Sequence, residues 1–422
     1  KYQKDSQKYV MIPAYARARH AAVLQRWEKL KAYCEGKVNY MFSKPRGRNS
    51  LDDIGIITSG VSYQYAREIF YNLPILKLNM TNPLPAGAIK SFTDGKRLVL
   101  VIEELEPYLE EQVRLINPQA HIAGQEYFPD FGELNLQIME DVYDILFGSE
   151  PSDGSRTGAQ SGDVIMHKTP DNNLADLPAR PPVLCAGCPH RSVFLILKKL
   201  KVAVMGDIGC YTLSVLPPLN TLDSTLCMGA GVGQALGMEK ADPGLRNRVV
   251  SVIGDSTFFH SGVTPMIDNA YNGGTGLIIV LDNGTTAMTG HQAHPGTGKT
   301  LMGLDVPDLK PEAFAAAAGI KNIRVVDPYD MKKLEEVFKE ELEKKELSFV
   351  VCRRICILLE KDKKTENVFI DQHLCKQCGI CLKFGCPAIE LREGLYKINN
   401  ILCTGCEVCF DTCKWKAIQS IR

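Results

Sequence analysis

The sequence predicts an α/β protein that carries a separate cysteine-rich module near its C-terminal end. Four near-continuous apolar runs predict strands of a parallel sheet covered on both faces: VAVMGDIG (202–209), RVVSVIGD (248–255), GLIIVLDN (276–283) and SFVVCRR (348–354). Eight of the 15 cysteines fall between Cys375 and Cys413. The chain of 422 residues is long enough for about three domains.

Charge and hydropathy exclude several classes of function. The 49 basic and 49 acidic residues cancel, so no net field gathers nucleic acid or an anionic membrane. The longest apolar runs, such as GLIIVL (276–281), are far shorter than the roughly 20 residues of a membrane span. We therefore expect a soluble protein. Cysteines at two-residue gaps without a signal peptide favour metal ligation in a reducing, anoxic cytoplasm, and a first residue other than Met is consistent with a fragment.

The order of segments along the chain predicts its domains. Apolar residues at helical spacing predict an amphipathic helix over 14–33, and the stretches 54–69 and 96–114 each predict a strand followed by a helix. A segment rich in Ser, Gly, Asp and Pro and a charged stretch predict two linkers. The resulting division is a helical N-terminal linker (1–40), an α/β domain (41–150), a linker (151–180), a second α/β domain (181–358), a linker (359–367) and a cysteine-rich domain (368–422).

The cysteine-rich domain is an internal repeat with the ligand spacing of iron–sulfur proteins. Two C-x2-C-x2-C runs superimpose at an offset of 28 residues, from Cys375 to Cys403. In two-cluster ferredoxins the fourth cysteine of each run ligates the other cluster, which lets its spacing vary. We therefore predict two [4Fe–4S] clusters, one held by Cys375, Cys378, Cys381 and Cys413 and the other by Cys403, Cys406, Cys409 and Cys386. The alternative is a pair of structural zinc sites, which need neither a swapped ligand nor a duplicated run.

Two motifs at predicted strand ends have the residues of a metal–diphosphate site. GDSTFFHSG (254–262) and LDNGTTAMTG (281–290) each follow an apolar run, and 25 residues separate GDS from DN. A carboxylate and an amide at the ends of neighbouring parallel strands can place hard oxygens around Mg²⁺, which bridges a diphosphate. From these residues alone, two ordinary strand-end turns remain the alternative.

Taken together, the motifs resemble those of 2-oxoacid:ferredoxin oxidoreductases. The set comprises CAGCPHR (185–191), GDIGCYTL (206–213), CMGAGVGQALG (227–237), the two strand-end motifs, MTGHQAHPGTG (288–298) and the two-cluster ferredoxin pattern. Within that family the set is most similar to the α subunit of indolepyruvate:ferredoxin oxidoreductases, from about Tyr9 onward. The resemblance implies a transketolase C-terminal-like first α/β domain, a thiamine diphosphate-binding, doubly wound second α/β domain, and an α+β two-cluster ferredoxin domain.

The resemblance also implies roles for individual residues. The family motif is G-D-G, about 25 residues, then N-N; here Ser256 replaces the second Gly and Asp282 the first Asn. Carried over, Asp255 and Asn283 are Mg²⁺ ligands through their side chains, and Thr285 through its backbone carbonyl. Further residues expected at the cofactor are Cys210, Ser256, His260 and Gly290. His291 and His294, and with less support His190 and Arg191, are candidates for contacts to the diphosphate or substrate or for proton transfer, with ordinary loop histidines as the alternative.

Four further cysteines match positions that hold a third cluster near the thiamine in related oxidoreductases. They are Cys185, Cys188, Cys210 and Cys352, with Cys356 and Cys227 as rival fourth ligands. Buried apolar thiols without a metal are the alternative.

The resemblance implies a catalytic and electron-transfer subunit. Its expected reaction is the oxidative decarboxylation of an arylpyruvate, such as indolepyruvate, to an acyl-CoA and CO₂, with electrons passing through clusters to an external ferredoxin. Expected requirements are thiamine diphosphate, Mg²⁺, coenzyme A and a β subunit in a hetero-oligomer. A pyrimidine-binding domain with an activating glutamate is also expected, and we see no sequence for it. Rival interpretations are an electron carrier without thiamine chemistry of its own, and a non-redox decarboxylase or carboligase, which would not need eight clustered cysteines.

Overall fold

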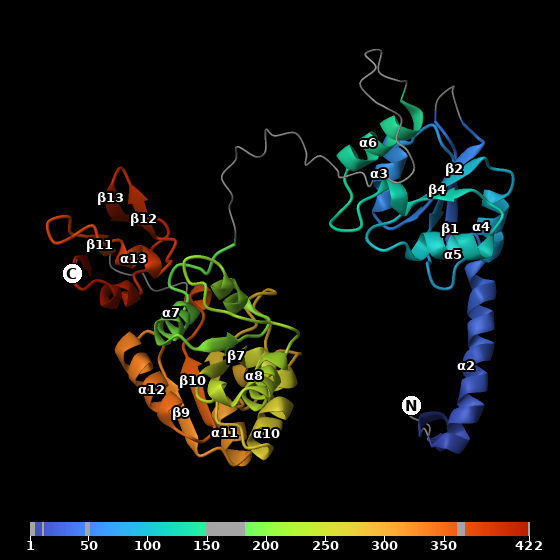
Figure 1. Ribbon diagram of the computed structural model, residues 1–422. Helices are drawn as coiled ribbons and strands as arrows, with labels where there is room; N and C mark the ends of the chain where they lie inside the picture. The colour runs from blue at the N-terminus through green and yellow to red at the C-terminus, as the bar shows by residue number, and fades with distance from the viewer. Residues whose placement is uncertain (1–4, 11, 47–50, 149–181, 361–367, 421–422) are drawn as a thin grey trace. The chain divides into compact units, whose positions relative to one another are not determined.

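The computed structural model describes residues 5–10, 12–46, 51–148, 182–360 and 368–420 (Figure 1). The chain divides into two compact units, Lys1–Ala179 and Arg180–Arg422, and each is described by itself. The predicted linker 151–180 lies outside the described residues, as do residues 361–367 of the second predicted linker. Within the described ranges, none of the helices combines the length and apolar character needed to cross a membrane.

The first unit begins with two helices, α1 (Ser6–Tyr9) and α2 (Pro13–Cys34). Pro13 occupies the first turn of α2, where its missing N–H costs no hydrogen bond. The sequence predicts an amphipathic helix here. The helix is present, but the prediction that it is amphipathic is wrong, because Cys34 is its only buried residue.

The rest of the first unit is a five-stranded sheet with helices on both faces. The strands are β1 (Tyr40–Ser43), β2 (Ile54–Ser59), β3 (Ile75–Leu78), β4 (Leu98–Ile102) and β5 (Ile122–Ala123), in the order β1-β3-β2-β4-β5. Only β1 runs antiparallel to its neighbour. The helices are α3 (Ser62–Ile69), α4 (Ala86–Thr93), α5 (Tyr108–Ile116) and α6 (Leu136–Phe147). Two apolar clusters lie on opposite faces, since α3 and α6 contribute to one and α4 and α5 to the other.

The second unit contains a fully parallel sheet, as the sequence predicts, with the four predicted strands and a fifth, β9 (Asn322–Val326), that was not predicted. Its strands are β6 (Ala203–Met205), β7 (Val249–Gly254), β8 (Leu277–Asp282), β9 (Asn322–Val326) and β10 (Ser348–Arg353), in the order β6-β7-β8-β10-β9. Helices α7 (His190–Leu200) and α12 (Met331–Glu343) pack on one face. Helices α8 (Ala230–Ala241), α10 (Val263–Tyr271) and α11 (Pro311–Ala317) pack on the other, with the short turn α9 (Asp255–Thr257) directly after β7.

The cysteine-rich part of the second unit has two similar halves. It contains β11 (Val368–Ile370), α13 (Ile380–Lys383), β12 (Ile389–Arg392), β13 (Leu395–Ile398) and β14 (Ile418–Ser420). Strand β11 pairs with β14 and β12 with β13, both antiparallel. Equivalent hydrogen bonds join the halves, because the N–H of Asp371 donates to Ala417 and that of Asn399 donates to Ala388, each at 2.8 Å. The sequence repeat therefore corresponds to a local two-fold arrangement of the backbone.

Candidate cofactor site and cysteine cavities

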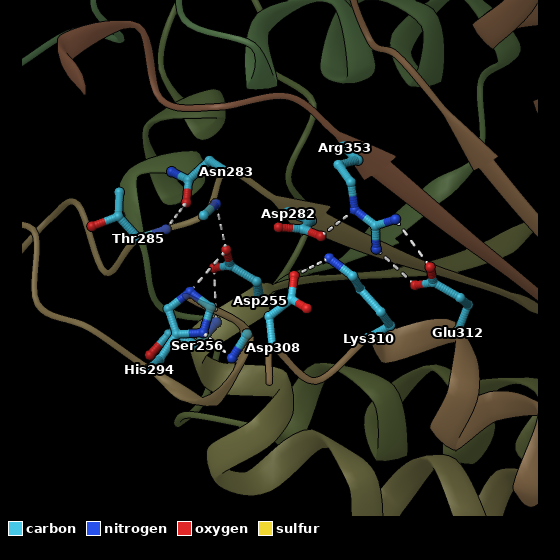
Figure 2. A network of polar contacts seen from close by, with 12 residues as sticks. Asp255, Ser256, Asp282, Asn283, Thr285, His294, Asp308, Lys310, Glu312 and Arg353 are labelled. Atoms are coloured by element: carbon cyan, nitrogen blue, oxygen red, sulfur yellow. Dashed lines mark hydrogen bonds and ion pairs between the residues drawn. The ribbon is translucent and has the colours of Figure 1, made fainter. Parts of the chain in front are cut away.

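The parallel sheet brings the two strand-end motifs to one edge. Gly254 of β7 pairs with Leu281 of β8, so Asp255 and Asn283 leave neighbouring strands side by side. Asp255, Asn283 and Thr285 are 3%, 6% and 5% exposed. Such burial is costly for polar groups unless hydrogen bonds or a ligand satisfy them. Figure 2 shows these side chains gathered around the end of β8.

Backbone donors hold the carboxylate of Asp255 in one orientation. The N–H of Ser256 donates to Oδ1 at 2.8 Å, and that of Gly284 donates to Oδ2 at 2.9 Å. Nε2 of His294 lies 3.1 Å from Oδ2. The ring of His294 also stacks on Phe259, at a centroid distance of 6.0 Å. These contacts pre-orient the carboxylate before any ligand binds.

The amide of Asn283 is oriented by His190. Nδ2 of Asn283 lies 3.4 Å from Nε2 of His190, and Oδ1 accepts from the N–H of Thr285 at 3.3 Å. Burial lowers the pKa of His190 to about 4, so its ring is neutral near pH 7 and can accept from the amide. The carbonyl of Thr285 accepts from the N–H of Ala287 at 3.0 Å, which leaves its second lone pair free.

A cavity of about 560 Å³, including space open to solvent, lies at this edge of the sheet. The predicted site residues that line it are Cys210, Asp255, Ser256, Asn283 and Thr285, together with His190. The other predicted residues lie elsewhere. His260 and His291 are exposed, and Gly290 is not part of the lining. His294 is buried against Asp255 and does not line the cavity.

Sequence reasoning missed Tyr211, which lines the same cavity. Its hydroxyl accepts from the N–H of Gly254 at 2.9 Å and lies 3.2 Å from the carbonyl of Ile208. Burial raises the pKa of Tyr211, so the hydroxyl stays protonated. A Cβ on Gly254 would lie 3.0 Å from the ring. The signal for this residue was its position directly after Cys210 in the GDIGC motif.

Asp282, which replaces the first Asn of the family motif, is not one of the oxygen-bearing residues that line the cavity. Asp282 accepts from Nε of Arg353 at 2.6 Å, and Arg353 in turn pairs with Glu312 at 2.7 Å. Asp282 does not line the cavity, whereas its neighbours Leu281 and Asn283 do. Figure 2 shows this ion-pair chain on the side of β8 away from His294. A carboxylate is accommodated here because an arginine on the adjacent strand neutralises it.

Two smaller cavities in the cysteine-rich part are each lined by four cysteines. The first, here called the outer cavity, has an empty volume of about 340 Å³ and is lined by Cys375, Cys378, Cys381 and Cys413. The second, the inner cavity, has an empty volume of about 320 Å³ and is lined by Cys386, Cys403, Cys406 and Cys409. Ala186 and Gly187 of the CAGC turn also line the inner cavity. The grouping is the swapped one that the spacing predicts.

Among the described residues, no group of three or more His, Cys, Asp or Glu side chains converges on a single metal ion. The cysteines surround their cavities instead. A [4Fe–4S] cluster needs this kind of arrangement, because each thiolate binds a different iron of the cube.

The other cysteines of the second unit separate into a group of four and two outliers, whereas Cys34 belongs to the first unit. Burial, followed by the nearby thiols of Cys185 and Cys210, raises the pKa of Cys188 to about 12. The pKa of Cys356 is raised by burial and also by Cys185. In contrast, burial alone raises the pKa of Cys352, which belongs to the core beneath α7 and α12. The structure therefore groups Cys356 rather than Cys352 with Cys185, Cys188 and Cys210, and Cys227 is exposed.

Cys356 also lies next to the candidate cofactor site. Its N–H donates to the backbone carbonyl of Asn283 at 3.0 Å.

Comparison with known proteins identifies the family. Residues 207–352 match the family described as thiamine pyrophosphate enzyme, C-terminal TPP binding domain. Indolepyruvate oxidoreductase subunit IorA of Pyrococcus horikoshii is 35% identical over 453 residues, which cover 100% of this chain and 68% of that protein. The subunit IorA of Archaeoglobus fulgidus is 33% identical over 438 residues, which cover 100% of this chain and 67% of that protein.

A solved structure of 2-oxoglutarate:ferredoxin oxidoreductase from Magnetococcus marinus, with 2-oxoglutarate, coenzyme A and succinyl-CoA bound, is also similar. Its TM-score is 0.38 at 22% identity, over 45% of this chain and 70% of that chain. The two IorA relatives match this chain along its whole length. The chain belongs to the family of indolepyruvate oxidoreductase subunit IorA and contains its thiamine pyrophosphate-binding domain.

Proposed function

We propose that this chain is the catalytic and electron-transfer subunit of an enzyme that oxidatively decarboxylates an arylpyruvate, with indolepyruvate as substrate, to the acyl-CoA. The observation that carries the proposal is the presence, in one compact unit, of a strand-end cavity with a buried carboxylate and amide and of two cavities lined by four cysteines each. The names of the curated relatives support the choice of indolepyruvate.

The residues at the strand-end cavity fit a magnesium-bound diphosphate. Asp255 and Asn283 offer side-chain oxygens, and Thr285 offers a carbonyl lone pair, which are the hard ligands that Mg²⁺ prefers. Cys210 and Ser256 line the same space. Thiamine diphosphate, when bound, supplies the decarboxylation chemistry. The protein holds Asp255 through backbone donors and Asn283 through His190, so that little reorganisation is needed on binding.

The two cysteine-lined cavities fit two [4Fe–4S] clusters with swapped fourth ligands. The ligands are Cys375, Cys378, Cys381 and Cys413 in the outer cavity, and Cys403, Cys406, Cys409 and Cys386 in the inner cavity. A third cluster close to the thiamine would be held by Cys185, Cys188, Cys210 and Cys356. Cys356 replaces the Cys352 that the sequence predicts, because its thiol is grouped electrostatically with the others.

The proposed reaction requires partners. A β subunit, a pyrimidine-binding domain, coenzyme A and an external ferredoxin as final electron acceptor complete the proposal, in a cytoplasmic hetero-oligomer. The relatives are named as subunits, which supports the proposed β subunit. The proposal also includes the predicted domains. Residues 41–150 form a transketolase C-terminal-like domain and residues 368–422 an α+β ferredoxin domain, and the other predicted ranges keep their boundaries.

The test is made anaerobically on the complete complex with thiamine diphosphate, Mg²⁺, coenzyme A and indolepyruvate. We expect the visible iron–sulfur absorbance to bleach only when both the thiamine cofactor and the 2-oxoacid are present. Asp255→Asn is expected to abolish this bleaching while dithionite still bleaches the clusters. Asp305→Asn, on an exposed loop, is the matched control and should behave as the wild type. Bleaching that does not depend on thiamine diphosphate would favour the electron-carrier interpretation.

A further inference from the structure

The guanidinium of Arg191 is buried between the CAGC turn and the cysteine-rich part. The residue lies in the first turn of α7 and is 2% exposed. Its Nη2 donates to the carbonyls of Leu184 at 2.5 Å and Cys185 at 3.0 Å. Its Nη1 donates to the carbonyl of Gly385. One side chain thus joins the turn that carries Cys185 to the segment that carries Cys386.

The two segments are packed closely around this side chain. A Cβ on Gly385 would lie 3.2 Å from Nη1 of Arg191, and Gly385 has a φ of +71° that favours glycine. A Cβ on Gly187 would lie 2.3 Å from Oγ1 of Thr404. The hydroxyl of Tyr329 donates to the carbonyl of Gly187 at 2.5 Å. The inner cavity therefore shares a wall with the turn that Arg191 supports.

No carboxylate neutralises Arg191 within the part of the chain that the structure describes. Its acceptors are neutral carbonyls, and its Nε has no hydrogen-bond partner there. A buried guanidinium without a counter-charge is costly, by several kcal/mol. The nearby groups that can carry negative charge are cysteines on both sides of the guanidinium, namely Cys386, Cys188, Cys185 and Cys406.

We propose that Arg191 is the counter-charge of the cluster in the inner cavity and the positioning residue that makes this cluster the entry point for electrons into the cysteine-rich part. The inference rests on the proposed function, because it requires the clusters. A cluster bound by four thiolates is negatively charged and gains one more negative charge on reduction. A nearby fixed positive charge stabilises the reduced form more than the oxidised form, so it raises the reduction potential of the inner cluster.

The electron balance of this step is simple. Oxidation of the 2-oxoacid at the thiamine site supplies electrons one at a time. The inner cluster accepts one electron and passes it to the outer cluster, and no bond forms or breaks. Arg191 takes no part in proton transfer, since a guanidinium stays protonated.

Three variants separate charge from packing. Arg191→Gln removes the charge and keeps hydrogen-bonding groups, whereas Arg191→Lys keeps the charge. Lys201→Gln removes an exposed charge from the far end of the same helix, about 15 Å along its axis. In each full complex, prepared anaerobically, iron is counted and cluster potentials are measured by a redox titration followed by electron paramagnetic resonance. Cys378→Ser, at an exposed ligand of the outer cavity, and Cys356→Ala, at a ligand of the proposed third cluster, identify two of the three signals, and the remaining signal belongs to the inner cluster.

We expect Arg191→Gln to lower the potential of the inner cluster relative to the outer one, while Arg191→Lys and Lys201→Gln stay near the wild type. Loss of inner-cavity iron in Arg191→Gln but not in Arg191→Lys would support the same role. Unchanged potentials in Arg191→Gln, or an equal shift of both clusters, would overturn it. So would loss of iron in both Arg191 variants, because packing would then be the cause. A wild-type complex without iron would instead refute the proposed function itself.

Discussion

Nε2 of His294 lies 3.1 Å from Oδ2 of Asp255, and both side chains are buried. Nδ1 of His294 accepts from the N–H of Gly296 at 3.1 Å, so Nε2 is the ring nitrogen that faces the carboxylate. The histidine therefore acts on the site through Asp255 and does not line the cavity.

Replacing this histidine is expected to weaken cofactor binding. A contact to a charged acceptor is worth about 1.5 kcal/mol, so His294→Ala should raise the Kd of thiamine diphosphate with Mg²⁺ roughly tenfold. Titration calorimetry on the anaerobic complex measures the Kd. His291→Ala, at the exposed histidine three residues earlier, is the matched control and should leave the Kd unchanged. Equal effects of the two variants would contradict a specific role for His294.

Breaking the ion pair between Asp282 and Arg353 is expected to lower the unfolding free energy, and a second substitution at Asp282 is expected to restore part of it. Arg353→Met leaves two carboxylates without their shared partner, Asp282 at 15% and Glu312 at 24% exposed, which should cost about 3 kcal/mol of unfolding free energy. Adding Asp282→Asn removes the more buried of the two unpaired charges and should recover part of that loss. Urea unfolding of the single and double variants measures the coupling. Additive losses would show that the pair does not contribute as a unit.

Two glycines with left-handed backbone allow the cost of backbone strain to be measured separately from the cost of a steric clash. Gly187 has a φ of +71°, and its Cβ would collide with Oγ1 of Thr404, whereas Gly273 has a φ of +60° and open space around it. Both substitutions to Ala should cost about 1 kcal/mol from the backbone alone. We expect Gly187→Ala to cost more and, in addition, to increase hydrogen exchange in 368–420. Thr404→Ala should relieve the additional part. Similar behaviour of Gly187→Ala and Gly273→Ala would mean that the contact is not rigid.

Iron content distinguishes the two rival ligands of the proposed third cluster. Cys356→Ala is expected to lower the iron content by the share of one cluster, because this thiol belongs to the group with Cys185, Cys188 and Cys210. Cys352→Ala should keep the iron and only lose packing in the core. Iron analysis and low-temperature spectra of the reduced protein measure the outcome. The opposite pattern would restore Cys352 as the ligand.

The choice of Cys352 came from the resemblance to related oxidoreductases, and the strand pattern could not correct it. Both cysteines lie near the end of one predicted strand, and spacing does not tell which thiol turns outward. In the structure, Cys352 is still within β10 and faces the core with Val350, whereas Cys356 lies beyond the strand. The sequence analysis did not predict the edge strand β9, because β9 lacks a continuous buried apolar run. Of its five residues, Asn322 is polar, Arg324 is charged and Val325 is exposed.

The parts that could be predicted are those that depend on short-range patterns. Continuous apolar runs gave four strands of the parallel sheet, and cysteine spacing gave the two groups of four that line the cavities. The position of His294 depends on how the loop after β8 folds back, and the role of Arg191 depends on a contact across almost 200 residues. No local pattern encodes either of them.

The exchange of cysteines between the halves has a consequence for biosynthesis. The first half of the repeat leaves the ribosome with three thiols of the outer cavity and one of the inner cavity, so neither site is complete. The inner cavity needs Cys409 and the outer cavity needs Cys413. The proposed clusters could therefore not be built one half at a time: the inner one would have all its ligands only after Cys409 has emerged, and the outer one only after Cys413.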